Sequence, residues 1–176
     1  MLMLSCALLA GCGVLLQQAP GSLQVRGASL LAAGRPAQLH LGLDCRLSGP
    51  MQDALDHGIP ITLRIDLQAG RWPRALVSTT RWIELRYFPL SRRYQLRETG
   101  NDDVRSFATP AHLIAALGSL RIDVPAEFAA LPATTPLTVS ARIDPGALPG
   151  ALRLPALFEP AWRLAAKDFA WTLAAR

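Results

Sequence analysis

Residues 59–67, IPITLRIDL, place an apolar side chain at every second position and a proline or polar residue between them. Side chains of a β-strand point alternately to its two faces, so this period predicts a strand with one face on a core and the other in water. The same period recurs at residues 39–47, 83–87 and 137–143. Alternation of this kind is typical of antiparallel sheets, because strands of parallel sheets are buried on both faces.

Weaker strand patterns extend this framework, at residues 23–31, 93–97, 152–157 and 162–173. Two segments read as short helices instead, residues 51–57 and 111–117. The first ends at Gly58 before Pro60, and the second begins with Thr109 as N-cap and Pro110 at the first helical position.

This order of elements predicts a mainly β fold, an antiparallel β-sandwich of the immunoglobulin-like kind with two short helices. An α+β roll with the helices against one face is the alternative. No linker divides residues 21–176, so we expect them to form a single domain.

The N-terminal segment predicts export. Residues 1–25 carry no charged side chain, and residues 1–16, MLMLSCALLAGCGVLL, are almost continuously apolar. This run is shorter than the ~20 residues of a membrane-spanning helix and has the length of a signal-peptide core. We therefore expect residues 1–20 to be a leader or anchor and the domain to lie on the periplasmic side of the inner membrane.

Within this leader, Leu9-Ala10-Gly11-Cys12 is similar to the lipobox of bacterial lipoproteins, which makes Cys12 the candidate lipid-attachment residue. Gly13 replaces the Asp that commonly retains lipoproteins at the inner membrane, so the outer membrane is the expected location. Ordinary cleavage near residue 19 and retention as an uncleaved anchor are the alternatives.

Charge and cysteine content restrict the function further. The chain has 18 Lys and Arg against 13 Asp and Glu, a net charge of +5, but acids are interspersed among the basic residues. A nucleic-acid partner is not expected, because such proteins gather their basic residues in a patch or stripe. Cys45 is the one cysteine after the leader, so the domain holds no internal disulfide.

No catalytic, metal or cofactor site is predicted. His40, His57 and His112 fall on separate elements, and no nucleophile, Walker or dinucleotide motif accompanies them. Four carboxylates lie on polar strand rows beside arginines, which favours cross-strand ion pairs. They are Asp44, Asp66, Glu84 and Asp144.

The candidate interaction surface is Arg71-Trp72-Pro73-Arg74, because Trp and Arg are enriched among interface anchors. Arg92 and Arg93 join this surface if a hairpin brings them close to it.

Several landmarks occur in an order and spacing that resemble a bacterial family, the domain of unknown function DUF4390. Residues 54–61, ALDHGIPI, resemble its helix-to-strand junction, and residues 85–94, LRYFPLSRRY, resemble its pair of strands. Further landmarks follow, namely Ser106-Phe107 with the 111–118 helix, Leu148-Pro149, Trp162 and Trp171. The family's tryptophan-rich segment is reduced here to Trp72. The resemblance implies an exported protein and points to envelope signalling.

Together these features predict a non-catalytic exported envelope protein that binds another envelope protein or a membrane surface. A periplasmic carrier of a small ligand or lipid is the alternative and would need an apolar pocket of several hundred cubic ångströms. A hydrolase is a further alternative and would need two or more of the carboxylates or histidines in contact.

Replacing Cys12 tests the lipobox. In cells fed an alkyne-palmitate probe, the parent chain should be labelled and Cys12→Ser should not, because the thiol is the acylated atom. Cys6→Ser is the matched control and should keep the label, since only five residues precede Cys6. An unlabelled parent chain would remove the lipid-attachment assignment and leave the export prediction standing.

Overall fold

The alternating stretch of the sequence forms strand β3 (Ile61–Arg71) in a computed structural model that describes residues 20–31, 37–71 and 74–173. β3 pairs in antiparallel fashion with β4 (Arg74–Phe88) on one side and β8 (Pro136–Ile143) on the other. Leu63 stands opposite both Ile83 and Ile143 in this register, so three apolar side chains form one row across the inner face.

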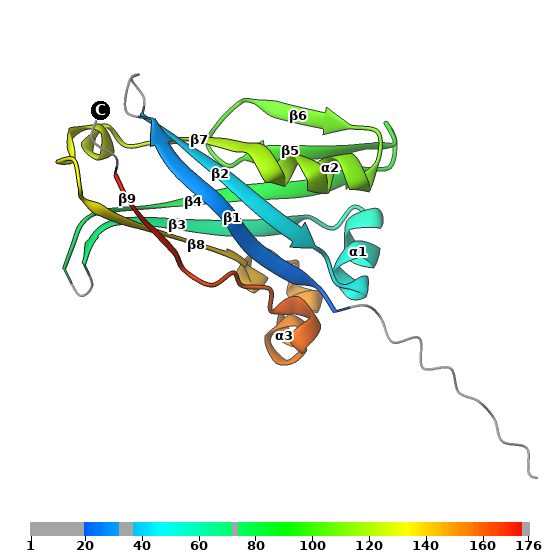
Figure 1. Ribbon diagram of the computed structural model, residues 1–176. Helices are drawn as coiled ribbons and strands as arrows, with labels where there is room; N and C mark the ends of the chain where they lie inside the picture. The colour runs from blue at the N-terminus through cyan, green and yellow to red at the C-terminus, as the bar shows by residue number, and fades with distance from the viewer. Residues whose placement is uncertain (1–19, 32–36, 72–73, 174–176) are drawn as a thin grey trace, which may run out of the picture.

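Two antiparallel sheets pack face to face, as the sequence predicts. The larger has the order β6-β5-β4-β3-β8-β9, with β5 (Arg93–Glu98), β6 (Val104–Phe107) and β9 (Phe169–Thr172). The smaller has the order β1-β2-β7, with β1 (Ser22–Leu31), β2 (Ala37–Arg46) and β7 (Leu120–Val124). Figure 1 shows β1 and β2 crossing obliquely in front of β3 and β4. The mainly β, antiparallel sandwich is therefore confirmed.

The core lies between the two sheets. The smaller sheet contributes Leu39, Leu41 and Ile122, and the inner row of β3 is almost inaccessible to solvent. That row comprises Ile61, Leu63, Ile65, Leu67 and Ala69, each at most 1% exposed. Full burial of a Leu or Ile side chain contributes about 1.5–3 kcal/mol, so these rows supply much of the driving force for folding.

The two predicted helices are present. Helix α1 (Gly49–Asp56) ends before Gly58, whose φ of +81° is one that residues with a side chain rarely adopt. Helix α2 (Pro110–Ala116) begins as predicted, because the Thr109 hydroxyl accepts a hydrogen bond from the backbone N–H of His112 at 3.3 Å. In the described residues, four 3₁₀ turns connect other elements, η1 (Leu117–Ser119), η2 (Ala126–Ala130), η3 (Pro145–Ala147) and η4 (Pro160–Trp162).

The strand predicted at residues 152–157 is wrong, because this segment is a third helix, α3 (Gly150–Phe158). The carbonyl oxygen of Pro149 accepts from the backbone N–H groups of Leu152 and Arg153 at 2.9 and 3.1 Å and starts the helical turn. Leu152 and Ala156 then face the core one helical turn apart. Short apolar runs fit both a strand and a helix, and here the tertiary packing decides.

Strand limits differ in other places. The sequence patterns do not predict β6 and β7, and β4 begins at Arg74, well before the predicted start at residue 83. Of the strand predicted at residues 162–173, β9 forms a regular strand, and Ala165 forms an isolated β-bridge with Arg142. Among the described residues, every helix is too short or too polar to cross a membrane. Cys12 lies outside the described residues.

Paired substitutions at neighbouring positions test the assigned register. Leu63→Asp should lower the free energy of unfolding by at least about 3 kcal/mol, because it buries an unpaired carboxyl group in the core. Arg64→Asp should lower it by about 1 kcal/mol or less, because Arg64 lies on the outer face in a partly exposed ion pair. Urea unfolding measures both, and equal midpoints would contradict the register.

Candidate functional site

The predicted interaction residues lie at two opposite ends of the larger sheet. Arg71 ends β3 and Arg74 begins β4, and Trp72 between them lies outside the described residues. Arg92 and Arg93 follow the far end of β4, a 15-residue strand. At ~3.3 Å per residue that strand is about 50 Å long, so the two arginine pairs do not form one surface. The condition under which Arg92 and Arg93 would join the Arg71–Arg74 surface is therefore not met.

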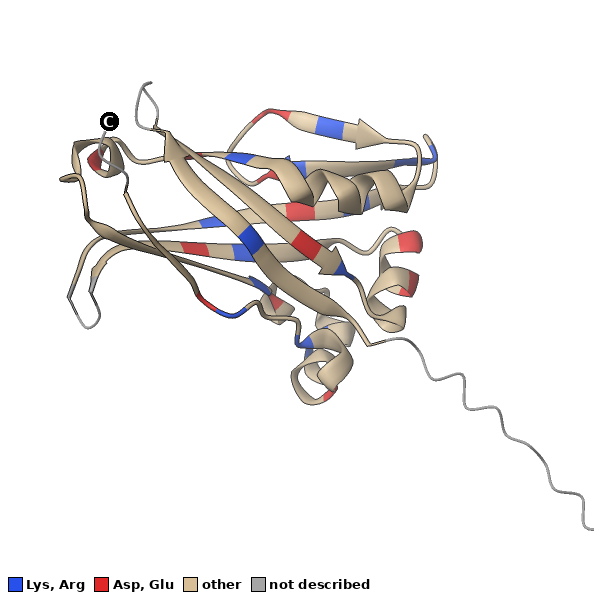
Figure 2. Cartoon of the chain, viewed as in Figure 1, with Lys and Arg blue, Asp and Glu red and all other residues tan. Residues whose placement is uncertain are grey.

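The outer face of the larger sheet gathers more arginines than either end. Cross-strand pairing puts Arg64 between Trp82 and Arg142, and Glu84 opposite Arg97. We call this surface the arginine face and define it by Arg64, Arg86, Arg97, Arg142, Trp82, Phe88 and the two acids Asp66 and Glu84. Figure 2 shows charges of both signs side by side on β3 and β4.

The acids of the arginine face are held by its cations. Asp66 lies 3.0 Å from Arg64 and 3.7 Å from Arg142, and it accepts a 2.6 Å hydrogen bond from Thr80. Glu84 lies 3.5 Å from Arg97. The predicted cross-strand ion pairs are present for both acids. Asp44 forms a third such pair, with Arg26 across β1 and β2, whereas Asp144 instead caps the backbone N–H of Gly146.

Aromatic rings stand among these charges. Trp82 is 39% exposed, and the Arg86 guanidinium lies 5.0 Å from the centre of the Phe88 ring, a cation–π contact. Arginine together with exposed aromatic side chains is the composition of a protein-binding surface.

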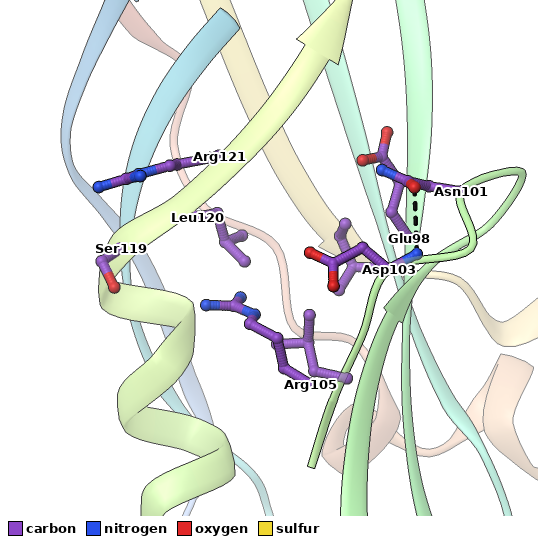
Figure 3. Close-up of a pocket in the computed structure, with 9 residues that line it drawn as sticks. Glu98, Asn101, Asp103, Arg105, Ser119, Leu120 and Arg121 are labelled. Carbon is purple, nitrogen blue, oxygen red and sulfur yellow. Dashed lines mark hydrogen bonds between the residues drawn. The ribbon is translucent and has the colours of Figure 1, made fainter.

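A cleft of about 330 Å³ opens between β5 and β6 of the larger sheet and the start of β7 of the smaller one. Figure 3 shows the Asp103 carboxylate and the Arg105 guanidinium reaching into it, while Arg121 points away. Asp103 is positioned by its own turn, because its backbone N–H donates to the side chain of Asn101 at 3.1 Å. This turn connects β5 to β6.

Two opposite charges lie on the inner face beside this cleft. The Arg81 side chain points to the same face of β4 as Ile83. Its Nε atom lies 3.4 Å from Glu98 and donates a hydrogen bond to the backbone oxygen of Asp123 at 3.0 Å. Burial raises the pKa of the Glu98 carboxyl, although Arg81 and a hydrogen bond with Asn101 act in the opposite direction. The pair ties β4 and β5 of the larger sheet to β7 of the smaller one.

The family model for the Domain of unknown function DUF4390 matches residues 21–172. The chain belongs to the DUF4390 family. No curated protein and no solved structure matches it.

Two of the segments that carry the DUF4390 resemblance, residues 54–61 and 85–94, meet at one corner of the molecule. Tyr87 and Tyr94 stack with ring centres 4.6 Å apart, and the Tyr94 hydroxyl donates to Asp56 at 2.8 Å. A side chain at Gly58 would lie 3.4 Å from the backbone oxygen of Tyr87. Burial, the hydrogen bond to Asp56 and nearby charges raise the pKa of Tyr94 to about 12, so this donor stays protonated.

This corner presents the β4–β5 hairpin turn to solvent. Leu90 at its tip is fully exposed, and Arg92 adopts a φ of +50° to close the turn. The Arg92-Arg93 pair of the DUF4390 protein therefore follows an exposed apolar residue at the tip of the turn. The Tyr94–Asp56 hydrogen bond attaches the base of this turn to helix α1.

The three histidines of the DUF4390 domain lie on different elements, and two make local contacts. His57 contacts the backbone oxygen of Asp53 at 2.6 Å, and His112 contacts the Thr109 hydroxyl at 2.9 Å. His40 lies on β2. In the described part of the chain, no group of three His, Cys, Asp or Glu side chains is placed to hold a metal ion. Burial and the charge of Asp44 raise the pKa of the Cys45 thiol to about 11.

An apolar groove of about 470 Å³ runs between the end of β2 and helices α1 and α2. Leu47, Leu55 and Ile114 are among the residues that line it. The sequence patterns predict neither this groove nor the Arg81–Glu98 pair. The sequence does contain a further pattern that indicates this pair. Arg81 lies two residues from Ile83, and Glu98 lies two residues from Leu96, so each charge falls on the apolar face of its strand. A charge on such a face requires a partner, because burying it alone is costly.

Glu98→Gln tests the environment of the cleft through pH. The pKa of an unfolded Glu is ~4.3, and the folded value is higher. As pH rises through this window the unfolded chain releases the proton first, so the parent protein loses stability that Glu98→Gln keeps. Urea unfolding between pH 4 and pH 8 should show the stability of the variant, relative to that of the parent, rising with pH and then levelling off.

Arg81→Gln provides the comparison for this experiment. It removes the cation that lowers the pKa of Glu98, so the loss of stability should extend to higher pH than in the parent protein. A stability difference between Glu98→Gln and the parent that stays constant over the pH range would contradict the assignment.

Proposed function

We propose that this DUF4390 protein is a non-catalytic interaction module of the bacterial envelope, exported across the inner membrane, which binds a partner protein through its arginine face. The observation that carries the proposal is the exposed Trp82 beside Arg64, on a face where arginines outnumber acids.

The chemistry of the arginine face favours an acidic protein partner. Asp66 forms ion pairs with two arginines, and Glu84 forms an ion pair with Arg97. Arg86 instead lies over the Phe88 ring. An incoming carboxylate can pair with Arg86 while Trp82 packs against apolar surface of the partner. Planar guanidinium groups bind carboxylates through paired hydrogen bonds, which gives both affinity and orientation.

Export is supported by the sequence before the domain. Residues 1–25 carry no charge, and residues 1–16 have the length and composition of a signal-peptide core.

A non-catalytic role is supported by how the charged groups are used. Arg81 and Glu98 hold the two sheets together, Asp66 and Glu84 pair with arginines, and Asp56 fixes Tyr94. Each of these contacts has a structural consequence, and the hydrolase alternative would require such groups to converge on a substrate.

The small-ligand alternative has one observation in its favour. The groove between α1 and α2 falls within the 300–1,000 Å³ range of ligand sites, and leucine and isoleucine side chains line much of it. Ile114→Trp would fill the groove and abolish ligand binding there, while the arginine face would remain unchanged.

Photo-crosslinking in the cell tests the arginine face. A photo-crosslinking amino acid in place of Gln95, which faces Arg86 across β4 and β5, should give a discrete protein adduct. In an Arg86→Glu, Arg97→Glu background the adduct should fall by about tenfold or more, because two attractive charges become repulsive. The same amino acid in place of Gln24 on the smaller sheet is the matched control and should give no such adduct.

Export is measured separately with a periplasm-dependent phosphatase fused after Arg176. An active fusion is expected, and an inactive fusion with normal protein level would contradict export. Adducts of equal yield with and without the charge reversal would contradict binding through the arginine face.

A further inference from the structure

We propose that the exposed apolar face of helix α3 docks the domain onto an anionic lipid bilayer, an inference that rests on the proposed export to the envelope. The α3 face is defined by Leu154, Leu157 and Phe158, which are 67%, 48% and 77% exposed.

These three side chains share one side of the helix. Residues three and four apart are neighbours on a helix surface, and Leu157 and Phe158 follow Leu154 at these spacings. Ala156 on the other side is fully buried. Helix α3 therefore has an inner side fixed in the core and an outer side that presents large apolar groups to solvent, the pattern of helices that lie in a membrane interface.

The chain enters the domain beside this helix. A Cβ atom at Gly21 would lie 2.8 Å from a side-chain carbon of Leu164 and from the backbone nitrogen of Ser48, so the backbone of the first residues is packed closely there. The Ser48 hydroxyl donates to the backbone oxygen of Ala161 at 2.7 Å. Figure 1 shows β1 starting next to α1 and α3.

η4 and the residues after it connect this entry point to the α3 face. η4 contacts both α1 and α3. The Arg163 guanidinium, one residue before Leu164, donates to the backbone oxygen of Leu157. The position where residues 1–20 join the domain and the α3 face are thus held together at one end of the molecule.

A lipid bilayer is the occupant that these features favour. Residues 1–16 are an apolar sequence expected to enter a membrane, and they lead directly to this end of the domain. Arg153 and Arg163 lie on or just after α3, and the Arg163 guanidinium is held against the helix by the backbone oxygen of Leu157. These two guanidinium groups can pair with anionic headgroups.

Photo-crosslinking of the full chain in vesicles tests the proposal. A photo-crosslinking amino acid replaces Leu157, and the protein is reconstituted in vesicles of phosphatidylethanolamine and phosphatidylglycerol. Mass spectrometry should show a lipid adduct at residue 157. The matched control places the same amino acid at Leu76, a leucine at the start of β4 that is even more exposed than Leu157, and should give about tenfold less lipid adduct.

Two further arms make the result specific. Leu154→Ser with Phe158→Ser should lower the adduct at residue 157 by about tenfold, and its urea midpoint should stay unchanged because both side chains are exposed. Vesicles without phosphatidylglycerol should lower it too, since the cations lose their counterpart.

A protein adduct at residue 157, to a second copy or to a partner in native membranes, would overturn the proposal, as would equal lipid labelling at residues 76 and 157. Equal labelling with and without phosphatidylglycerol would overturn the anionic preference. The phosphatase fusion reads export independently of α3, so failure of membrane docking and failure of the proposed function give different results.

Discussion

The burial of one strand on one face is the constraint on which this structure depends. β3 is hydrogen-bonded on both edges, and its inner side chains from Ile61 to Ala69 are almost completely removed from water. Their alternation fixes which residues of β4 and β8 also point inward, because a shift by one residue would turn every side chain to the opposite face. The smaller sheet then has one apolar surface on which to pack.

The same register determines which charged and aromatic side chains lie together on the outer face of the larger sheet. Positions that alternate with the core row carry the arginine face, so Arg64 stands beside Trp82 because Leu63 stands beside Ile83. Where the apolar row reaches the edge of the smaller sheet, Arg81 and Glu98 replace aliphatic side chains and neutralise each other. An isolated charge there would carry a large desolvation cost.

The helices and the hairpin turn lie at the ends of the strands, where sheet pairing no longer constrains the chain. α1 supports the β4–β5 turn through Asp56 and Tyr94, and η4 joins α1 to α3 beside the first residues of the domain. The two proposed contacts, with a protein through the arginine face and with lipid through α3, therefore occupy different parts of the surface. A domain held at a membrane by one end can present its sheet to a partner.

The sequence alone determined what depends on neighbours along the chain. The alternation of Leu63 and Arg64, the stop at Gly58 and the start at Thr109 are local signals, and each predicts the observed element. Tertiary structure decided what depends on distant segments: α3 at residues 152–157, the strands β6 and β7, and the separation of Arg71 from Arg92 by the length of β4. Short apolar runs are compatible with either a helix or a strand, and the position of one hairpin end relative to another follows from strand lengths. Both are settled by packing between residues far apart in the chain, which local periodicity does not record.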